Sequence, residues 1–472
     1  MRGKDDFFLF SCPASCIIYI KAENKPMSIN PKIFKTYDVR GIYPAEVNEE
    51  AANKIGAAFA IYLSGKTDNV VVGRDARISS PGLFKALVEG ITLQGLDVID
   101  IGICTTPMLI FATKKIGGDV GGIMLSASHS PPNINGLKLM GERSIQMMDE
   151  EVEPIKQLAL AGNFVDVDER GSVIPRNILD EYIQHVLGFC GQIKGLRVVA
   201  DYGNGVGAVS GREVFNKLNI DYIPMYEELD GSFPNHFPDP HNIENMNELR
   251  ERVKAEKANL GIFFDGDADR SIMIDETGEI VFADMLVAAL AREELKKYPG
   301  EKVYYDLRFS KAVKEIIEQS GGVPIMMRVG NPFYKKEMAL RGGALAGEFS
   351  GHLFFKENYA IDDGLFAAIK TMDLICKLGK RLSELINPLK KYFATEEINM
   401  KISDADETLK KVKEHYKDGH SIDLDGVYIE YPDWWFSLRK SNTEPVVRLR
   451  LEANNKDLLE EKRGELVRLI GS

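Results

Sequence analysis

From about residue 48 to residue 128, apolar positions alternate between a helical period and an extended period. In residues 48–65, one helical face carries apolar side chains, with Asn48 as the N-cap, Gly65 as the stop, and a stripe of Ala52, Ile55, Phe59 and Leu63. The run NVVVGRD predicts a buried strand, and SSPGLFKALVEGITLQG predicts a helix with a serine cap and a proline in its first turn. A strand (97–102), a helix (107–117) and a strand (121–128) follow. Strands joined by crossover helices predict a mainly parallel sheet with helices on both faces.

The same alternation restarts after Pro175 and again after residue 279, and it changes character near residue 395. The sequence therefore predicts three doubly wound α/β domains and a smaller C-terminal α+β domain, with bounds at 27–174, 175–279, 280–392 and 393–472. Residues 1–26 are interpreted as an N-terminal extension of unknown role. Their apolar segment is short and interrupted by Pro13, which does not suit a membrane span, and it lacks the cleavage site of a signal peptide.

Composition narrows the classes of partner. The 472 residues carry a net charge of -12, which argues against nucleic acid or an anionic membrane as a partner, because both require a broad positive surface. A small anionic substrate remains compatible if cations are gathered in a cleft. Five scattered cysteines do not form a disulfide framework and favour a cytoplasmic location. We expect a monomer or a weak dimer.

The first candidate site follows the strand at 121–128. The stretch SASHSPPNINGLK places Ser128 and His129 before two prolines and an Asn-Gly turn, with Lys138 at its end. In open α/β sheets, reactive groups gather beyond the carboxyl ends of the strands. We therefore interpret Ser128 as an exposed nucleophile rather than as a serine in an ordinary tight turn.

The second candidate is the acidic loop FFDGDADR. Asp265, Asp267 and Asp269 place three carboxylates directly after a hydrophobic strand. Two such charges about 4 Å apart repel by roughly 4 kcal/mol at an effective dielectric of 20, so three in a cleft need a cation or protonation. Hard oxygen ligands in this arrangement favour Mg2+ or Ca2+, with a merely solvated acidic loop as the alternative. With Glu276 the spacing also matches a calcium-binding loop, but Arg270 stands where that loop needs glycine, and the flanking residues predict strands rather than helices.

Two further loops carry groups suited to a phosphorylated sugar. GEFSGH offers Glu348 and Ser350 for sugar hydroxyls, with an ordinary polar turn as an equal alternative. RKSNTEPVVRLR combines hydroxyls, amides and guanidinium groups that suit a phosphate dianion, with an ordinary charged hairpin as the alternative. The residues concerned are Arg439, Ser441, Asn442, Thr443 and Arg448. Arg40, in YDVRG, is either a surface charge or another phosphate contact.

In this order the motifs resemble those of the α-D-phosphohexomutase family, of the phosphomannomutase/phosphoglucomutase kind. YDVRG is similar to the family's opening, SASHSP to its phosphoserine loop and NGLK to its Asn-Gly-x-Lys motif; DGSFPNHFPDP, DGDADR, GEFSGH and RKSNTEP then follow in the expected sequence. The resemblance extends from about Phe34 to the C-terminus. It implies three related α/β domains and a smaller fourth around one cleft. The implied reaction exchanges the 1-phosphate and 6-phosphate of mannose or glucose through a phosphoserine enzyme, with hexose 1,6-bisphosphate as intermediate and activator.

The resemblance also implies roles for individual residues. Ser128 would carry the phosphoryl group, and Asp265, Asp267 and Asp269 would hold Mg2+, with the phosphate on Ser128 as a fourth oxygen ligand.

His129 and Lys138 are the implied candidates for proton transfer, and Arg270 would steady the moving phosphoryl group. The implied contacts to the phosphosugar substrate are Arg40, Asn331, Glu348, Ser350, His352, Arg439, Ser441, Asn442, Thr443 and Arg448.

Some positions depart from the family pattern. Asn331 stands where histidine often contacts the sugar, Ser130 replaces the usual asparagine after the Ser-His pair, and Ile134 and Ile243 replace a common aromatic residue and a frequent proline. GEFSG is nearer to the mannose/glucose form of the sugar loop than to the glucosamine form. Phosphoglucosamine mutase is therefore the alternative within the same chemistry. A catalytically silent sugar-phosphate or calcium-binding relative would require a missing serine, metal ligand or phosphate loop, and none is missing.

Overall fold

The computed structural model describes residues 29–116, 118–165, 167–440 and 446–471, together with a two-residue strand pair, β1 (Phe7–Phe8) and β2 (Ile20–Lys21). Most of the extension expected at 1–26 lies outside the described residues. So do Ser441, Asn442 and Thr443 of the predicted phosphate loop. In the part of the chain that is described, no helix is long and apolar enough to cross a membrane.

The chain divides into two compact units. The first comprises Met1–Gly191, Val199–Leu249 and Phe263–Ser271, and the second comprises Gln192–Val198, Arg250–Ile262 and Ile272–Ser472.

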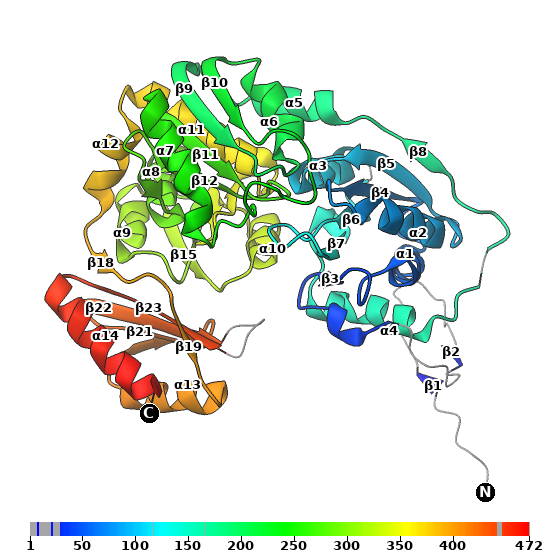
Figure 1. The fold of residues 1–472 in the computed structure, drawn as a ribbon. Helices are drawn as coiled ribbons and strands as arrows, with labels where there is room; N and C mark the ends of the chain where they lie inside the picture. Colours follow the sequence, from blue (N-terminus) through cyan, green and yellow to red (C-terminus); the bar gives the residue numbers. More distant parts are fainter. Residues whose placement is uncertain are drawn as a thin grey trace, which may run out of the picture. The chain divides into compact units, whose positions relative to one another are not determined.

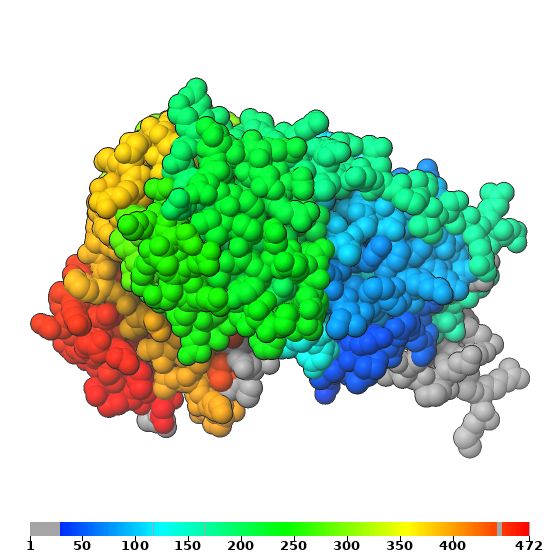
Figure 2. All heavy atoms as spheres, turned by 45° about the horizontal axis from the view of Figure 1, so that its top comes forward, coloured from blue at the N-terminus to red at the C-terminus, as the bar shows by residue number. Residues whose placement is uncertain are grey.

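The first unit is built on a six-stranded sheet with the order β3-β7-β6-β4-β5-β8 (Figure 1). Its strands are β3 (Val39–Ile42), β4 (Asn69–Arg74), β5 (Asp97–Ile103), β6 (Gly122–Leu125), β7 (Ile134–Met140) and β8 (Val173–Pro175). The pairs β6–β4, β4–β5 and β5–β8 are parallel, whereas β7 is antiparallel to both β3 and β6. The sheet is therefore mixed, with a parallel centre as the sequence predicted. The connection carrying β8 runs over the surface of this unit (Figure 2), and Val173 and Ile174 are exposed.

Four helices accompany this sheet: α1 (Glu49–Leu63), α2 (Ser80–Thr92), α3 (Thr106–Ile116) and α4 (Glu153–Ala161). Asn48 caps α1 as predicted, because its side chain accepts a hydrogen bond from Ala51 N at 3.0 Å. The predicted apolar stripe of α1 is buried, and α1, α2 and α4 share one core with the sheet. Ser79 occupies the N-cap position of α2, as predicted, although its side chain makes no capping bond; its hydroxyl accepts a hydrogen bond from Asn135 Nδ2 at 2.8 Å.

The Asn-Gly turn predicted after the two prolines is wrong. Asn135 and Gly136 lie inside β7 and are fully buried between β3 and β6. Pairing on both sides overrides the local turn preference of the dipeptide. Strand β7 then carries Lys138 as a buried side chain into the site described below.

The second sheet has the order β10-β9-β11-β12-β13, and the division between the units passes through it. Its strands are β9 (Lys194–Asp201), β10 (Asn219–Met225), β11 (Leu260–Phe264), β12 (Ser271–Asp275) and β13 (Ile280–Val281), and its helices are α5 (Leu179–Leu187), α6 (Gly207–Phe215) and α7 (Asn247–Glu256). The acidic loop joins β11 directly to β12. Because strands flank the loop on both sides, as predicted, it is not a helix-loop-helix calcium site.

The second unit contains two more sheets. One has the order β15-β14-β16-β17, with parallel pairing on both sides of β14 and an antiparallel β16–β17 pair. Its elements are α8 (Ala283–Lys297), β14 (Lys302–Asp306), α9 (Lys311–Gln319), β15 (Val323–Met327), α10 (Asn331–Arg341), β16 (Leu345–Gly347), β17 (Leu353–Phe355), α11 (Gly364–Leu378) and α12 (Leu382–Ile386).

The last sheet is antiparallel, with the order β18-β23-β22-β21-β20 and β19 paired to β23. It is formed by β18 (Phe393–Ala394), β19 (Ile398–Lys401), β20 (His420–Ile422), β21 (Val427–Glu430), β22 (Trp434–Lys440) and β23 (Val446–Ala453), with α13 (Ala405–His415) and α14 (Lys456–Gly471). Alternate residues of β22 and β23, such as Phe436 and Leu449, pack with both helices in one core. Since strand side chains alternate between faces, Arg439 and Arg448 project from the opposite face.

Candidate active site

Ser128 lies just beyond the carboxyl end of β6. Its backbone has a φ of 50°, a left-handed conformation that is uncommon for serine. Its hydroxyl donates a hydrogen bond to Asp265 Oδ2 at 2.7 Å, so two loops 137 positions apart in the sequence meet at this point. The expectation of an exposed serine is wrong, because Ser128 is 5% exposed, covered by the acidic loop.

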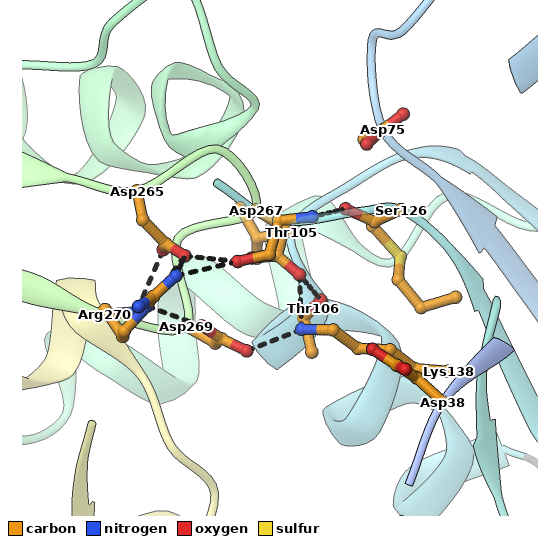
Figure 3. A network of polar contacts seen from close by, with 12 residues as sticks. Asp38, Asp75, Thr105, Thr106, Ser126, Lys138, Asp265, Asp267, Asp269 and Arg270 are labelled. Atoms are coloured by element: carbon orange, nitrogen blue, oxygen red, sulfur yellow. Dashed lines mark hydrogen bonds and ion pairs between the residues drawn. The ribbon is translucent and has the colours of Figure 1, made fainter. Parts of the chain in front are cut away.

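Lys138 reaches the acidic loop from β7. Its Nζ donates to Asp267 Oδ2 at 2.6 Å and to Asp269 Oδ2 at 2.7 Å. Thr106, at the start of α3, also donates its hydroxyl to Asp267 Oδ2. Figure 3 shows Lys138, Thr106 and the aspartates converging on one another from different elements. The predicted Lys138 therefore binds two of the three aspartates of the acidic loop.

Arg270 closes the other side of the same loop. Its Nη2 donates to Asp265 Oδ2 at 2.8 Å and to Ser128 Oγ at 3.0 Å, and it also contacts His129 Nδ1. His129 Nδ1 lies 3.2 Å from Ser128 Oγ. The structure thus brings together all the residues for which the sequence predicted a role in phosphoryl transfer.

The buried charges perturb one another. Burial, reinforced by the two other aspartates and opposed by Arg270, raises the pKa of Asp265 to about 7. Burial alone would lower the pKa of Lys138, but Asp267 and Asp269 outweigh it and the pKa is raised, which makes Lys138 a fixed cation. Burial and then Arg270 hold the pKa of His129 well below its usual value.

The acidic loop fits a divalent cation. Asp265, Asp267 and Asp269 each offer a carboxylate oxygen within 4.8 Å of the other two. Asp267 Oδ1 is buried and has no hydrogen-bond partner among the residues that the structure describes. Three carboxylates also outnumber the two buried cations, Lys138 and Arg270. Hard oxygen ligands with excess negative charge are the donor set that Mg2+ or Ca2+ prefers.

Arg40 lies beside residues 126–134, the segment after β6 that carries Ser128 and is called the serine loop below. Its Nη1 donates to Ser130 Oγ at 3.2 Å, and its Nη2 pairs with Asp38 at 2.7 Å. Arg40 is therefore a half-buried cation bonded to the serine loop at Ser130, rather than an isolated surface charge.

In the second unit, the loop after β16 carries the predicted sugar contacts. Glu348 Oε1 accepts a hydrogen bond from Gly330 N at 3.0 Å, which fixes the carboxylate. Ser350 Oγ is buried without a hydrogen-bond partner in the described ranges. A buried hydroxyl that still lacks a partner is available to a ligand.

A buried carboxylate, Asp362, gathers the neighbouring predicted residues. Asn331 Nδ2 donates to Asp362 Oδ2 at 2.7 Å, and His352 Nδ1 lies 3.0 Å from the same oxygen. Lys335 Nζ completes the group at 2.8 Å from Asp362 Oδ1.

The predicted arginines of the C-terminal sheet share one carboxylate. Arg439 Nη2 donates to Glu397 Oε2 at 2.8 Å, and Arg448 Nη1 lies 3.6 Å from Glu397 Oε1. Arg308, after β14, connects this group to the sugar loop, because it lies 3.5 Å from Glu397 and 3.7 Å from Glu348. The Glu397 carboxylate thus draws three guanidinium groups together, and guanidinium groups are the donors best suited to a phosphate.

Four charged residues near these sites were not predicted from the sequence: Arg77, Arg308, Asp362 and Glu397. For two of them, the sequence contains a pattern that could have identified them. Arg77 and Arg308 each stand two residues after an aspartate that follows an apolar strand, in GRDAR and YYDLR. Asp362 and Glu397 stand in no pattern that marks them, and only the tertiary structure identifies them.

Known proteins match this chain along most of its length. Four family models match in order along the chain: phosphoglucomutase/phosphomannomutase α/β/α domain I at residues 31–166, domain II at 180–278, domain III at 283–392 and the C-terminal domain at 397–469. A phosphomannomutase/phosphoglucomutase of Pseudomonas syringae pv. tomato is 34% identical over 93% of this chain and 96% of its own length. A phosphomannomutase of Methanocaldococcus jannaschii is 36% identical over 93% of this chain and 97% of its own length. The crystal structure of a phosphoglucomutase/phosphomannomutase family protein from Burkholderia thailandensis superposes with a TM-score of 0.87 at 31% identity, covering 94% of this chain and 97% of that one. The chain therefore belongs to the phosphoglucomutase/phosphomannomutase family, the α-D-phosphohexomutases.

Proposed function

We propose that this protein interconverts the 1-phosphate and 6-phosphate of a hexose, mannose or glucose, through a phosphorylated Ser128. As a member of its family it is an isomerase of hexose phosphates. The observation that carries the serine assignment is the 2.7 Å hydrogen bond from Ser128 Oγ to Asp265, inside a loop that fits a divalent cation.

In the first half of the proposed reaction, phosphoserine 128 transfers its phosphoryl group to a hydroxyl of the sugar phosphate. The bond between phosphorus and Ser128 Oγ breaks as the bond to the sugar oxygen forms, and the hydroxyl proton leaves to a base. The second half reverses these events with the other phosphate of the hexose 1,6-bisphosphate, which restores phosphoserine. The resemblance gives His129 and Lys138 as the candidates for proton transfer; because Lys138 is held as a cation, His129 is the one that can accept the hydroxyl proton, and Lys138 can act only as a donor.

Fixed positive charge near the transferring group is the main electrostatic requirement. Arg270, whose guanidinium lies 3.0 Å from Ser128 Oγ, would donate to phosphoryl oxygens during transfer. Asp265, Asp267 and Asp269 would hold Mg2+, which would neutralise part of the phosphoryl charge.

The residues that would contact the substrate are predicted from the resemblance to the family. Glu348 and Ser350 are proposed to bind sugar hydroxyls, with Asn331 and His352 nearby. The cations and loop groups proposed for phosphate are Arg40, Arg439, Ser441, Asn442, Thr443 and Arg448. The preference for mannose or glucose over glucosamine rests on the sequence of the sugar loop.

Phosphorylation of Ser128 provides the test. After incubation with Mg2+ and glucose 1,6-bisphosphate, intact mass and peptide mapping should find one phosphate on Ser128 of the wild type. Ser128→Ala should lose both the phosphate and mutase activity, whereas Ser172→Ala, an exposed serine in the same unit, should keep both. Coupled assays with mannose 1-phosphate, glucose 1-phosphate and glucosamine 1-phosphate identify the substrate. Labelling that persists in Ser128→Ala would refute the serine assignment, and turnover of the amino sugar alone would favour phosphoglucosamine mutase.

Three expectations stay predictions: the domain bounds at 27–174, 175–279, 280–392 and 393–472, the cytoplasmic location, and a monomeric or weakly dimeric state. Limited proteolysis tests the first, and sedimentation velocity tests the last.

A further inference from the structure

Arg77 lies in a short turn after β4, and its side chain is completely buried. Its Nε donates to Asp75 Oδ2 at 3.0 Å, and its backbone N donates to Asp75 Oδ1 at 3.1 Å. Ser80 Oγ donates to the same Asp75 Oδ1 at 2.6 Å. The aspartate therefore fixes both the backbone and the guanidinium plane of Arg77.

The remaining donors of Arg77 all bind the serine loop. Nη1 donates to the carbonyl oxygens of Pro131 at 2.7 Å and Ile134 at 2.9 Å, and Nη2 donates to those of Ser128 at 2.9 Å and Ser130 at 2.7 Å. A guanidinium has five N–H groups in a rigid fork. All five are used here, four of them on main-chain oxygens within seven residues of one loop.

A second surface holds Arg77 against this loop. The ring of Phe233 lies 5.1 Å from the guanidinium carbon, and Gly231 approaches so closely that an added Cβ would lie 2.4 Å from Arg77 Cα. The ring therefore faces the guanidinium, and the backbone of the turn is closely packed against Gly231.

These contacts bear on the conformation of Ser128. A left-handed serine is a strained conformation that persists only when its surroundings enforce it. The carbonyl of Ser128 is held by Arg77 on one side and lies close to Gly266 on the other, where an added Cβ would be 2.4 Å from it. With the carbonyl fixed, the Ser128 side chain is directed toward Asp265.

We propose that Arg77 is a positioning residue for phosphoryl transfer, which holds the serine loop in the one conformation that presents Ser128 Oγ to the acidic loop. Arg77 does not touch the reacting atoms. The proposal rests on the proposed function of Ser128, and it predicts two separable effects of disturbing Arg77: a more mobile loop and a slower chemical step.

The test compares Arg77→Lys with Arg74→Lys. Lysine keeps the charge next to Asp75, but three donors on one nitrogen cannot span four carbonyl oxygens. Arg74 is a matched control on β4, paired with Asp100 at 2.8 Å and stacked on Phe84; among the residues that the structure describes, its side chain makes no hydrogen bond or ion pair with the serine loop. Hydrogen exchange of the peptide 126–136, measured without substrate, reports loop order, and steady-state kinetics report kcat and KM separately.

For Arg77→Lys we expect exchange in 126–136 to rise about tenfold while the helices α1 and α2 exchange at the wild-type rate. We expect kcat to fall about 100-fold, the scale of a 1 Å misplacement, with KM within about threefold of wild type. Arg74→Lys should change none of these. The expected combination supports the proposal.

Three outcomes would overturn it: a wild-type kcat in Arg77→Lys, a lowered kcat with unchanged exchange in 126–136, or faster exchange throughout the first unit, which would make Arg77 a general stabiliser of the fold. Absence of mutase activity in the wild type would instead contradict the proposed function, and the exchange experiment would still decide whether Arg77 orders the loop.

Discussion

Replacing Gly266 with alanine tests how closely the serine loop and the acidic loop must approach. A Cβ on Gly266 would lie 2.4 Å from the carbonyl oxygen of Ser128 and 3.2 Å from its carbonyl carbon. On the other side it would lie 3.2 Å from Cγ of Pro238. Non-bonded heavy atoms in contact are about 3.5 Å apart, so the two loops would have to separate by about 1 Å.

A separation of this size has two costs. The hydrogen bond from Ser128 Oγ to Asp265, now 2.7 Å, would lengthen beyond hydrogen-bonding range. A misplacement of about 1 Å at a reacting group costs about 100-fold in rate, and forcing an extra methyl into a packed site costs about 1–3 kcal/mol of stability. Even a protein with only about 5 kcal/mol of stability would keep about 2 kcal/mol and remain more than about 95% folded. Unfolding therefore cannot account for a 100-fold loss of activity.

The assay is kcat from a coupled mutase assay at 25 °C, with the thermal midpoint of the same samples. Gly464→Ala is the matched control, because the nearest atom to its added Cβ is the flexible end of Arg468 at 3.5 Å. We expect kcat to fall about 100-fold in Gly266→Ala and to remain unchanged in Gly464→Ala. If Gly266→Ala retained both the wild-type kcat and the wild-type midpoint, the close approach of the two loops would not be needed for activity.

Two further predictions concern the buried carboxylates. Mg2+ at about 100 times its dissociation constant should raise the free energy of unfolding of the wild type by about 2.7 kcal/mol in a thermal or urea titration. Asp267→Asn should lose this gain, whereas Asp168→Asn, at an exposed position, should keep it. An equal gain in the wild type and both variants would place the ion elsewhere. For Asp306, burial would raise the carboxyl pKa, but Arg308 and hydrogen bonds outweigh burial and the pKa is lowered. Its stabilising contribution is therefore complete above the unfolded pKa, about 3.9, and is lost as pH falls through the lower folded value. Urea unfolding should show Asp306→Asn less stable than wild type by the same amount from pH 5 to 8, with the difference shrinking below about pH 4; a difference that also changes between pH 5 and 8 would contradict this assignment.

Local periodicity was enough to predict most elements of the first domain. The stripe from Ala52 to Leu63 is buried as predicted, because a helix with one apolar face has only one way to cover it. The turn predicted at Asn135 was wrong for a long-range reason. Asn135 pairs in β7 and donates to the Ser79 hydroxyl, so contacts distant in the sequence replace a local turn preference.

The sequence indicated the chemistry of the site but not its geometry. Residue types indicated a nucleophile and a cation loop, yet nothing in the spacing places Ser128 next to Asp265. That contact depends on how β6 and β11 are brought together by the tertiary fold. The burial of Ser128 has the same origin, since the loop that covers it lies more than a hundred residues later in the sequence.

The Asp-x-Arg pattern shows what a sequence signal could have added. After β4, Asp75 accepts from the backbone and Nε of Arg77; after β14, Asp306 accepts from the backbone of Arg308 at 2.8 Å and from its Nε at 2.9 Å. Both turns follow a strand with neighbours on both sides, so the charged pair is buried and must satisfy its donors and acceptors internally.

Each pair does so through an adjacent functional loop. In the first unit the arginine supplies the link, by donating to the carbonyls around Ser128. In the second unit the aspartate supplies it, because Asp306 Oδ2 accepts from Phe349 N at 3.0 Å, inside the sugar loop. Because unsatisfied buried polar groups are costly, neither loop can move without breaking bonds to its pair. In both units, the hydrogen bonds that satisfy the buried ion pair therefore also hold in place a loop that carries predicted functional residues.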